Sequence, residues 1–205
     1  MSTTGRLFVI SAPSGAGKTT LVHRIMAADP SLCFSISYTT RDRRHNEKEG
    51  ESYHFVSKEQ FEKMIAAGEF LEHAEVFDNY YGTPKQGVQD LLKQGRNVIL
   101  EIDWQGAQQV RKNMPDCLSV FILPPSVKEL EQRLRGRATD SDEVIARRLA
   151  DSVADISHWQ EFDYAVINDD LDTATATLQS ILGGDNEANL TTSPEIKAAL
   201  EQILS

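Results

Sequence analysis

Five consecutive residues near the N-terminus have the types and spacing of a phosphate-binding loop: Gly15, Ala16, Gly17, Lys18 and Thr19. They follow the apolar run Leu7–Ser11 and precede an amphipathic stretch, so a strand, a loop and a helix are expected in that order. The free N–H groups at the helix start attract an anion, Lys18 adds a charge for the β and γ phosphates, and the Thr19 hydroxyl can reach Mg²⁺. A purely structural turn is the simpler alternative, but a lysine in the first helical turn opposes the helix dipole. We therefore predict that this loop binds the phosphates of a nucleotide.

Two carboxylates, Glu101 and Asp103, end the apolar run Asn97–Ile102. Carboxylates at a strand end that faces a phosphate loop organise Mg²⁺ or its waters in phosphoryl-transfer enzymes. Asp103 could also cap the helix that follows, and the two roles are compatible.

A second group of candidate residues follows the apolar run Phe34–Tyr38. Arg41 and Arg44 offer forked donors suited to a phosphate, although a solvated basic patch would explain this stretch alone equally well. Further along, tyrosine hydroxyls can hold phosphate oxygens, and the carboxylate of Glu72 can accept two hydrogen bonds from a base edge with adjacent N–H donors, as in guanine. Each residue alone reads as core or surface. Their occurrence in one polar segment predicts a recognition site.

Arginines also gather in the stretch "EQRLRGRATDSDEVIARRL". Arg133 and Arg137 are four residues apart on one helical face, and Arg147 and Arg148 follow. Like charges at that spacing repel, so the cluster favours anionic phosphates arriving between them. Pairing with acidic neighbours is the alternative that the sequence leaves open, and the candidates are Glu129, Asp140 and Asp142.

Strand-like and helix-like segments alternate along most of the chain, which predicts an α/β sandwich with a parallel sheet. The expected strands are Leu7–Ser11, Phe34–Tyr38, Asn97–Ile102, Leu118–Leu123 and Tyr164–Ile167. The expected helices are Gly17–Ala28, Gln105–Asn113, a helix opened by Ser126 with Glu129, Asp142–Trp159 and Leu171–Leu182. A mixed segment interrupts this rhythm, with short strands at Tyr53–Val56 and Phe70–Val76 and a helix capped by Ser57 and Gln60. We predict a core of residues 1–40 and 93–184 with a helical lid at about 126–150, an insertion at 41–92 and a C-terminal tail helix within 185–205.

Composition excludes several other classes of protein. The 205 residues carry a net charge of -10 and a pI near 5.0, which argues against a nucleic-acid or anionic-membrane partner. No apolar run approaches the roughly 18 residues needed to cross a bilayer, and the N-terminus lacks the features of a secretory signal. Cys33 and Cys117 are expected to be buried free thiols, and the five histidines show no metal-ligand spacing. A cytoplasmic protein is expected.

Taken together, these motifs resemble those of guanylate kinases. The segments are "SAPSGAGKTT", "SYTTRDRR", "YHFV", "FLEHAEVFDNYYGT", "LEIDWQGAQQVR", "FILPPS", "RLRGRATDSDEVIARRL" and "VINDDLD". The resemblance covers about Leu7 to Leu182. It implies a P-loop three-layer sandwich with a five-stranded parallel sheet, a GMP-binding insertion and a helical lid. It also implies phosphoryl transfer with Mg²⁺ from ATP to GMP, and to dGMP, in purine nucleotide metabolism. Family members occur as monomers and as larger assemblies, so the oligomeric state stays open.

The resemblance also implies roles for single residues. The ATP site would comprise Ala12, Pro13, Ser14, Gly15, Ala16, Gly17, Lys18, Thr19 and Thr20, with Asn168 near the adenine. The GMP phosphate would be held by Arg41, Arg44, Tyr53 and Tyr81, and the guanine by Ser37, Glu72 and Thr83 with Glu101 near N2. The residues that act on the transferred phosphoryl group would be Lys18, Arg41, Asp103, Arg133, Arg137 and Arg148. Thr19 would meet Mg²⁺ mostly through phosphates and water.

Four positions depart from the commonest family pattern. Ala12 replaces a frequent glycine, His45-Asn46 stands where Pro-Gly is common, Thr83 stands for serine and Glu101 for aspartate.

Two other functions are alternatives to a guanylate kinase activity. A kinase for another nucleoside monophosphate is disfavoured by the guanine set of Ser37, Glu72 and Thr83. A related protein-binding module without catalysis is disfavoured because the phosphate loop and the arginines are all present.

Overall fold

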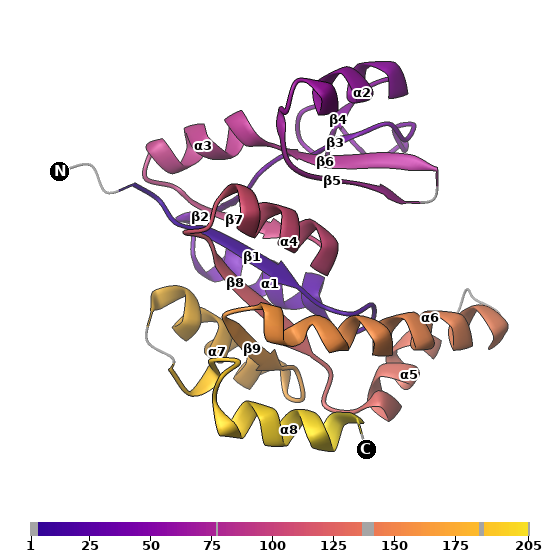
Figure 1. Ribbon diagram of the computed structural model, residues 1–205, viewed down its shortest axis with the longest axis vertical. Coiled ribbons are helices and arrows are strands. Elements are labelled where there is room, and N and C mark those ends of the chain that lie inside the picture. The colour runs from indigo at the N-terminus through magenta and orange to yellow at the C-terminus, as the bar shows by residue number, and fades with distance from the viewer. Residues whose placement is uncertain (1–3, 77, 137–141, 185–186, 205) are drawn as a thin grey trace. The chain divides into compact units, whose positions relative to one another are not determined.

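The computed structural model describes residues 4–76, 78–136, 142–184 and 187–204 (Figure 1). The chain forms two compact units. Unit 1 comprises Met1–Phe8, Ser31–Leu100 and Gln105–Cys117, and unit 2 comprises Val9–Pro30, Glu101–Trp104 and Leu118–Ser205. Among the described helices, none has both the length and the apolar character required to span a bilayer.

A five-stranded sheet has the order β2-β7-β1-β8-β9 within the described residues. Its strands are β1 (Leu7–Ser11), β2 (Leu32–Phe34), β7 (Asn97–Glu101), β8 (Leu118–Leu123) and β9 (Tyr164–Ile167). The pairs β2–β7 and β8–β9 are parallel, which confirms the predicted sheet type. All five residues of β1 are buried. Both faces of this strand are covered, which explains why its sequence shows no alternation of apolar and polar residues.

One predicted strand was wrong in its bounds. The run Phe34–Tyr38 is not a single strand, because β2 ends at Phe34 and Tyr38 opens β3 (Tyr38–Thr39) of a second sheet. Phe34 is 36% exposed, whereas the Tyr38 ring lies 4.7 Å from the His54 ring and 5.9 Å from the Phe70 ring. Phe34 therefore ends its strand at the surface, whereas Tyr38 packs against aromatic rings of the second sheet.

The second sheet belongs to unit 1 and has the order β4-β3-β6-β5. Its other strands are β4 (His54–Phe55), β5 (Phe70–Val76) and β6 (Asn79–Pro84). Unit 1 also contains the helices α2 (Lys58–Ala66) and α3 (Lys85–Lys93) and most of α4 (Trp104–Asn113), whose first residue belongs to unit 2. Phe61 of α2 stacks on Phe70 at 4.5 Å and on Tyr80 at 5.4 Å. A Cβ on Gly82 would come within 2.9 Å of Phe61, so this position must be glycine for α2 to cover the sheet.

The helices of unit 2 are α1 (Lys18–Ala28), α5 (Val127–Arg135), α6 (Asp142–Ile156), α7 (Leu171–Gly183) and α8 (Pro194–Leu204), with 3₁₀ turns at Ser157–Glu161 and Glu187–Asn189. The predicted caps are confirmed: Ser126 Oγ accepts from Glu129 N at 3.0 Å, and Ser57 Oγ accepts from Gln60 N at 3.1 Å. The predicted helix Asp142–Trp159 ends earlier, because the chain tightens into a 3₁₀ turn after Ile156. Cys117 is buried and Cys33 only partly so, and both are free thiols.

Candidate functional site

The phosphate loop joins β1 to α1 and has the backbone that its glycines permit. Gly15 and Gly17 have φ values of 92° and 93°, in the left-handed region that favours glycine. Gly17 is the N-cap of α1 and offers no side chain, so the first N–H groups of the helix remain available to an anion. The Lys18 Nζ donates to the carbonyl oxygen of Ile102 at 3.0 Å. Burial lowers the pKa of Lys18, while Glu101 and Asp103 oppose that shift.

A hollow of about 310 Å³ lies over this loop, lined by Ala12, Pro13, Ser14, Gly15, Gly17, Lys18, Thr19, Thr20, Asp103 and Asp155. The Thr19 hydroxyl donates to Glu101 Oε1, so the hydroxyl and a carboxylate meet at one edge of the loop. Asp155 was not predicted. Its Oδ1 accepts from the Trp104 indole at 2.9 Å, and burial raises its pKa. A basic loop with carboxylates beside it can hold both phosphates and a hydrated cation.

A second hollow of about 300 Å³ in unit 2 is lined by Gly15, Gly17, Thr20, Arg133, Asn168, Asp169 and Leu171. Asn168 is buried, and its Nδ2 donates to the Ala16 carbonyl oxygen at 2.7 Å. The structure thus places Asn168 against the phosphate loop as well as in this hollow. This hydrogen bond ties the side chain of Asn168 to the backbone of the loop, a role that the sequence did not indicate.

Gly17→Ala is expected to disable the loop and to destabilise the fold. A Cβ at this position would lie 2.3 Å from Asn168 Nδ2. The alanine would also have to keep the positive φ of Gly17, which residues with a side chain rarely adopt. Gly68 also has a positive φ of 68°, but a Cβ there meets nothing within 4 Å, so Gly68→Ala is a matched control. We expect the control to cost about 1 kcal/mol, and Gly17→Ala about 3 kcal/mol because the Asn168 hydrogen bond is lost as well.

Urea unfolding followed by circular dichroism measures both costs, and titration with ATP measures loop function. Equal destabilisation of the two variants, with unchanged ATP affinity, would contradict the packing role assigned to Gly17 and Asn168.

The arginines predicted to act on the transferred phosphoryl group have different partners. Arg148 of α6 donates to Ser14 Oγ at 3.0 Å, so this guanidinium lies at the phosphate loop. Arg133 of α5 donates to Glu129 at 3.0 Å and to the Asn168 carbonyl oxygen at 3.1 Å. Pairing of Arg133 with Glu129, which the sequence left open, is therefore present, whereas Asp142 pairs with Arg135. Arg137 and Asp140 lie outside the described residues.

In unit 1, the predicted guanine-reading residues Glu72 and Thr83 face each other across the strand pair β5–β6. Both are buried, and Thr83 Oγ1 donates to Glu72 Oε1 at 2.6 Å. Thr83 follows Gly82 along the strand, so it lies on the face opposite to Phe61. Ser37 directly precedes β3, and its carbonyl oxygen accepts from His54 N at 2.9 Å. The Glu72 carboxylate, which accepts one hydrogen bond from Thr83, has the capacity to accept two more from a pair of adjacent N–H groups.

All four predicted phosphate-binding residues belong to unit 1, and three of them lie close together. The Arg41 guanidinium carbon lies 5.7 Å from the centre of the Tyr53 ring, and the Tyr53 and Tyr81 rings are 6.1 Å apart. Burial raises the pKa of Tyr53, so its hydroxyl remains a neutral donor. Arg44, the fourth, has an exposed side chain, and its backbone N–H donates to Glu47 at 2.8 Å. Two tyrosines and an arginine at these separations can surround one phosphate group.

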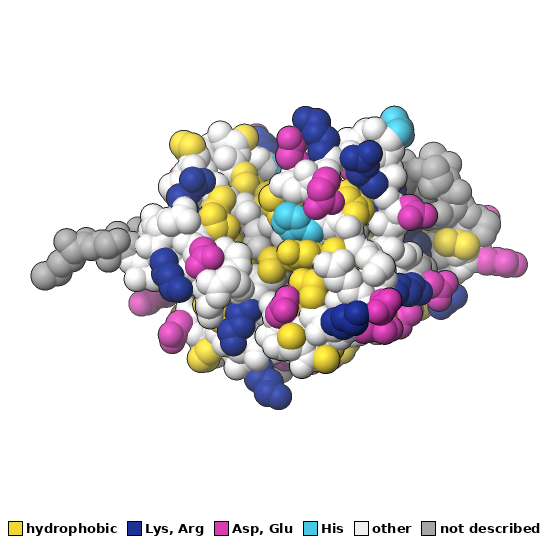
Figure 2. Space-filling model, turned by 90° about the horizontal axis from the view of Figure 1, so that it is seen from above, with side chains coloured by type: hydrophobic (Ala, Val, Ile, Leu, Met, Phe, Trp, Pro, Cys, Tyr) yellow, Lys and Arg dark blue, Asp and Glu magenta, His cyan; other side chains and the backbone are white. Residues whose placement is uncertain are grey.

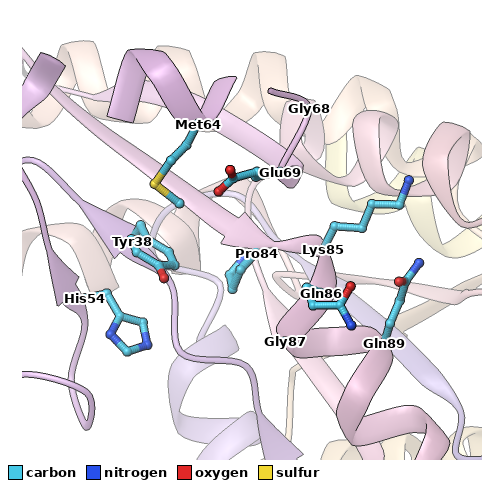
Figure 3. A pocket seen from close by; sticks show the side chains of 10 residues that line it. All are labelled: Tyr38, His54, Met64, Gly68, Glu69, Pro84, Lys85, Gln86, Gly87 and Gln89. Atoms are coloured by element: carbon cyan, nitrogen blue, oxygen red, sulfur yellow. The ribbon is translucent and has the colours of Figure 1, made fainter. Parts of the chain in front are cut away.

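Another hollow of unit 1, of about 480 Å³, contains none of the predicted site residues (Figure 3). Its lining comprises Tyr38, His54, Met64, Gly68, Glu69, Pro84, Lys85, Gln86, Gly87 and Gln89. In the close view, Met64 and Tyr38 lie together, whereas the ends of Lys85 and Gln89 extend away from them. Its polar side chains Glu69, Lys85 and Gln86 are exposed, which is typical of an open groove rather than a built ligand site. In the space-filling view from above, apolar side chains gather near the centre around a histidine, with basic and acidic groups interspersed around them (Figure 2).

Sequence reasoning missed three residues that shape the site. Glu47 binds Arg41, Ser152 Oγ donates to the Ser14 carbonyl oxygen at 3.1 Å, and Asp155 lines the loop hollow. Glu47 was recognisable only as an acid three residues after Arg44 in a polar segment. Ser152 and Asp155 lie within a helix that reads as amphipathic, so neither carried a local signal.

A parallel sheet whose first strand ends in a glycine-rich loop carrying Lys18 and Thr19 defines a P-loop nucleotide-binding protein. Comparison with known proteins narrows the class. A family model described as guanylate kinase matches residues 4–184. A guanylate kinase of Alkalilimnicola ehrlichii is 51% identical over 200 residues, which is 98% of each chain. A guanylate kinase of Escherichia coli K12 is 51% identical over 180 residues, which is 87% of each chain.

Among solved structures, a guanylate kinase from Anaplasma phagocytophilum has a TM-score of 0.67 and 33% identity, covering 98% of this chain and 95% of its own. The chain described here therefore belongs to the guanylate kinase family.

Proposed function

We propose that this chain catalyses the ATP-dependent phosphorylation of GMP to GDP. Family membership supports the reaction class, and the buried Glu72–Thr83 pair is the observation that supports GMP as the acceptor. A GMP phosphate oxygen attacks the γ-phosphorus of ATP in line, and ADP leaves. Such a transfer needs little covalent or general-base chemistry from the protein, so the residues act mainly by positioning and by stabilising charge.

The phosphate loop would bind the donor. The N–H groups at the start of α1 face the phosphates, and Lys18 lies at the first position of the same helix. Arg148 already contacts Ser14 of the loop, so its guanidinium is close to where the transferred group develops charge. Arg133 would supply a second charge on exchanging Glu129 for a phosphate oxygen. Hydrogen bonds from these groups would strengthen as charge builds on the equatorial oxygens.

Mg²⁺ fits the donor set beside the loop. The Thr19 hydroxyl and the Glu101 and Asp103 carboxylates are hard oxygen donors, which suit this ion. Within the described residues there is no cluster of three or more metal-binding side chains, so most of the ligands would be ATP oxygens and water. Bound there, the ion would neutralise charge on the β and γ phosphates. Thr19, Glu101 and Asp103 would hold its water shell in place.

Selection of guanine would rest on Glu72. Guanine presents adjacent N1–H and N2–H donors, and the carboxylate can accept both while still accepting the Thr83 hydroxyl. Adenine has an acceptor at N1 and no amino group at C2, so AMP would leave a buried carboxylate facing an acceptor. Sites that hydrogen-bond a specific group reject analogues lacking it by about 10⁴-fold or more.

A coupled assay of ADP release tests the proposal. The protein is supplied with ATP, Mg²⁺ and one acceptor at a time, chosen from GMP, dGMP, AMP, CMP and UMP. Turnover with GMP, and with dGMP, is expected, whereas AMP, CMP and UMP should give only the background rate. Comparable rates with GMP and AMP would contradict the role of Glu72, and no GMP-dependent ADP release would contradict the kinase activity itself.

A further inference from the structure

Glu47 holds the side chain of Arg41 in one orientation. Its Oε1 accepts from Arg41 Nη2 at 2.7 Å and its Oε2 from Arg41 Nη1 at 3.0 Å, which is a two-pronged ion pair. Both side chains are largely shielded from solvent, with 17% of Arg41 and 14% of Glu47 exposed. Ion pairs of this geometry restrict the guanidinium much more than single contacts at the surface do.

Two further contacts complete this arrangement. The Asp42 carbonyl oxygen accepts a second hydrogen from Arg41 Nη1 at 2.7 Å, and Glu47 Oε2 also accepts the Arg44 backbone N–H at 2.8 Å. One carboxylate therefore joins the side chain of Arg41 to the backbone of Arg44. Hydrogen bonding to Arg41, and then to Arg44, lowers the pKa of Glu47 to about 2, so the carboxylate is charged at neutral pH.

The remaining donors of Arg41 form a single edge. An arginine has five N–H donors, and the contacts with Glu47 and Asp42 use three of them. The two that remain are Nε–H and the outer hydrogen of Nη2, which lie side by side and match the spacing of two phosphate oxygens. Tyr53 lies against the same guanidinium, and hydrogen bonding with Tyr81 raises the pKa of Arg41, although less than hydrogen bonding with Glu47 does.

We propose that Glu47 is a positioning residue for the acceptor phosphate: it directs the Nε–Nη2 edge of Arg41 toward the GMP phosphate, beside Tyr53 and Tyr81. This inference rests on the proposed function, because it assigns Arg41 to GMP. The carboxylate does not touch the substrate. It acts by keeping Arg41 from pairing elsewhere and by removing the entropy cost of ordering that side chain when GMP binds.

A comparison of GMP with guanosine tests the proposal. Both carry the same base, and only GMP carries the phosphate. Binding of each is measured by calorimetry without ATP for the parent, Glu47→Gln, Glu47→Asp and the control Glu51→Gln. Glu51 lies in the same segment and forms an exposed ion pair with Lys48, so the control removes the same charge from a solvated position.

We expect Glu47→Gln to weaken GMP about tenfold, with guanosine affinity, the KM for ATP and the thermal unfolding midpoint close to those of the parent. Glu47→Asp keeps the charge and should recover part of the loss, and Glu51→Gln should behave as the parent does. In an Arg41→Met background, Glu47→Gln should have no further effect on GMP affinity.

Several outcomes would overturn the inference. Equal weakening of GMP and guanosine would mean that Glu47 only supports the segment. Tighter GMP binding by Glu47→Gln would mean that the carboxylate competes with the phosphate for Arg41. Unchanged GMP binding by Glu47→Gln would mean that Arg41 needs no positioning. A parent protein that binds GMP no better than guanosine would instead contradict the proposed function, which keeps the two failures distinct.

Discussion

Lys18→Met is expected to lower kcat/KM about 10³-fold without unfolding the protein. The lysine lies at the first position of α1 and donates to the Ile102 carbonyl oxygen, from where it can reach the phosphates held by the loop. Methionine has a similar length and fills the same space, but it carries no charge. The rate falls because charge on the transferring phosphoryl group is no longer stabilised by this ammonium group.

The same substitution should not reduce stability. Burial already lowers the pKa of Lys18, which means that the folded protein disfavours the charged form, and the charge also opposes the dipole of α1. We therefore expect the thermal midpoint of Lys18→Met to equal or exceed that of the parent. Lost activity with retained stability would identify a residue whose charge is kept for function.

Lys58→Met provides the matched control for this experiment. Lys58 is also the first residue of its helix, α2, but it is exposed and lies in the other unit. The control removes one positive charge at an equivalent helical position and should leave steady-state rates unchanged. An active Lys18→Met protein, or an equally inactive Lys58→Met protein, would contradict the assignment of Lys18 to the donor phosphates.

Glu72→Gln is expected to raise the KM for GMP by about 10²-fold and to leave the KM for ATP unchanged. The glutamine amide keeps one acceptor for the Thr83 hydroxyl, but it replaces the second acceptor with an N–H₂ group. Facing the N–H edge of guanine, that group donates to a donor. The preference for GMP over AMP should fall at the same time, because AMP no longer leaves a buried charge unpaired.

Glu75→Gln serves as the control for Glu72→Gln. Glu75 lies on the same strand β5, opposite Tyr80, and is exposed to solvent. Steady-state kinetics with varied GMP at saturating ATP, and with varied AMP, separate the two carboxylates. A Glu72→Gln protein with unchanged KM for GMP, or one in which the KM values for GMP and ATP rise together, would show that Glu72 does not read the base.

Local signals were sufficient to predict the elements that build the sheet and its loop. The unbroken apolar run Leu7–Ser11 predicted a strand with both faces buried, and the capping pairs at Ser57 and Ser126 predicted two helix starts. Each of these features depends on residues within about one helical turn of each other. The sequence therefore contains the physical cause of the structure at those positions.

Other features depend on residues that are far apart in the chain. The apolar run Phe34–Tyr38 is continuous in the sequence, yet Tyr38 belongs to the second sheet, where its ring packs against the rings of His54 and Phe70. Glu72 faces Thr83 only because the register of β5 and β6 shifts between Phe70 and Glu72, and no local pattern indicates that shift. Contacts of this kind require the tertiary structure.

Within the site, charge and shape were predictable separately but their combination was not. The donor groups of Arg41, Tyr53 and Tyr81 are recognisable in the sequence as suited to a phosphate. The ion pair of Arg41 with Glu47 is not, because nothing in the polar segment distinguishes Glu47 from its acidic neighbours. Asn168 was assigned to the base of ATP, and the structure adds its bond to the Ala16 carbonyl oxygen. Side chains that act on other protein groups, rather than on the ligand, leave no chemical signature in the sequence.

The central claim is that this chain transfers the γ-phosphoryl group of ATP to GMP in preference to other nucleoside monophosphates. A single competition reaction tests it most directly: ATP labelled at the γ-phosphate is incubated with Mg²⁺, the protein and an equimolar mixture of GMP, AMP, CMP and UMP, and the labelled products are separated. The predicted result is label in GDP alone, with none in inorganic phosphate beyond the protein-free control. Label spread over several nucleoside diphosphates, or released mainly as inorganic phosphate, would contradict it.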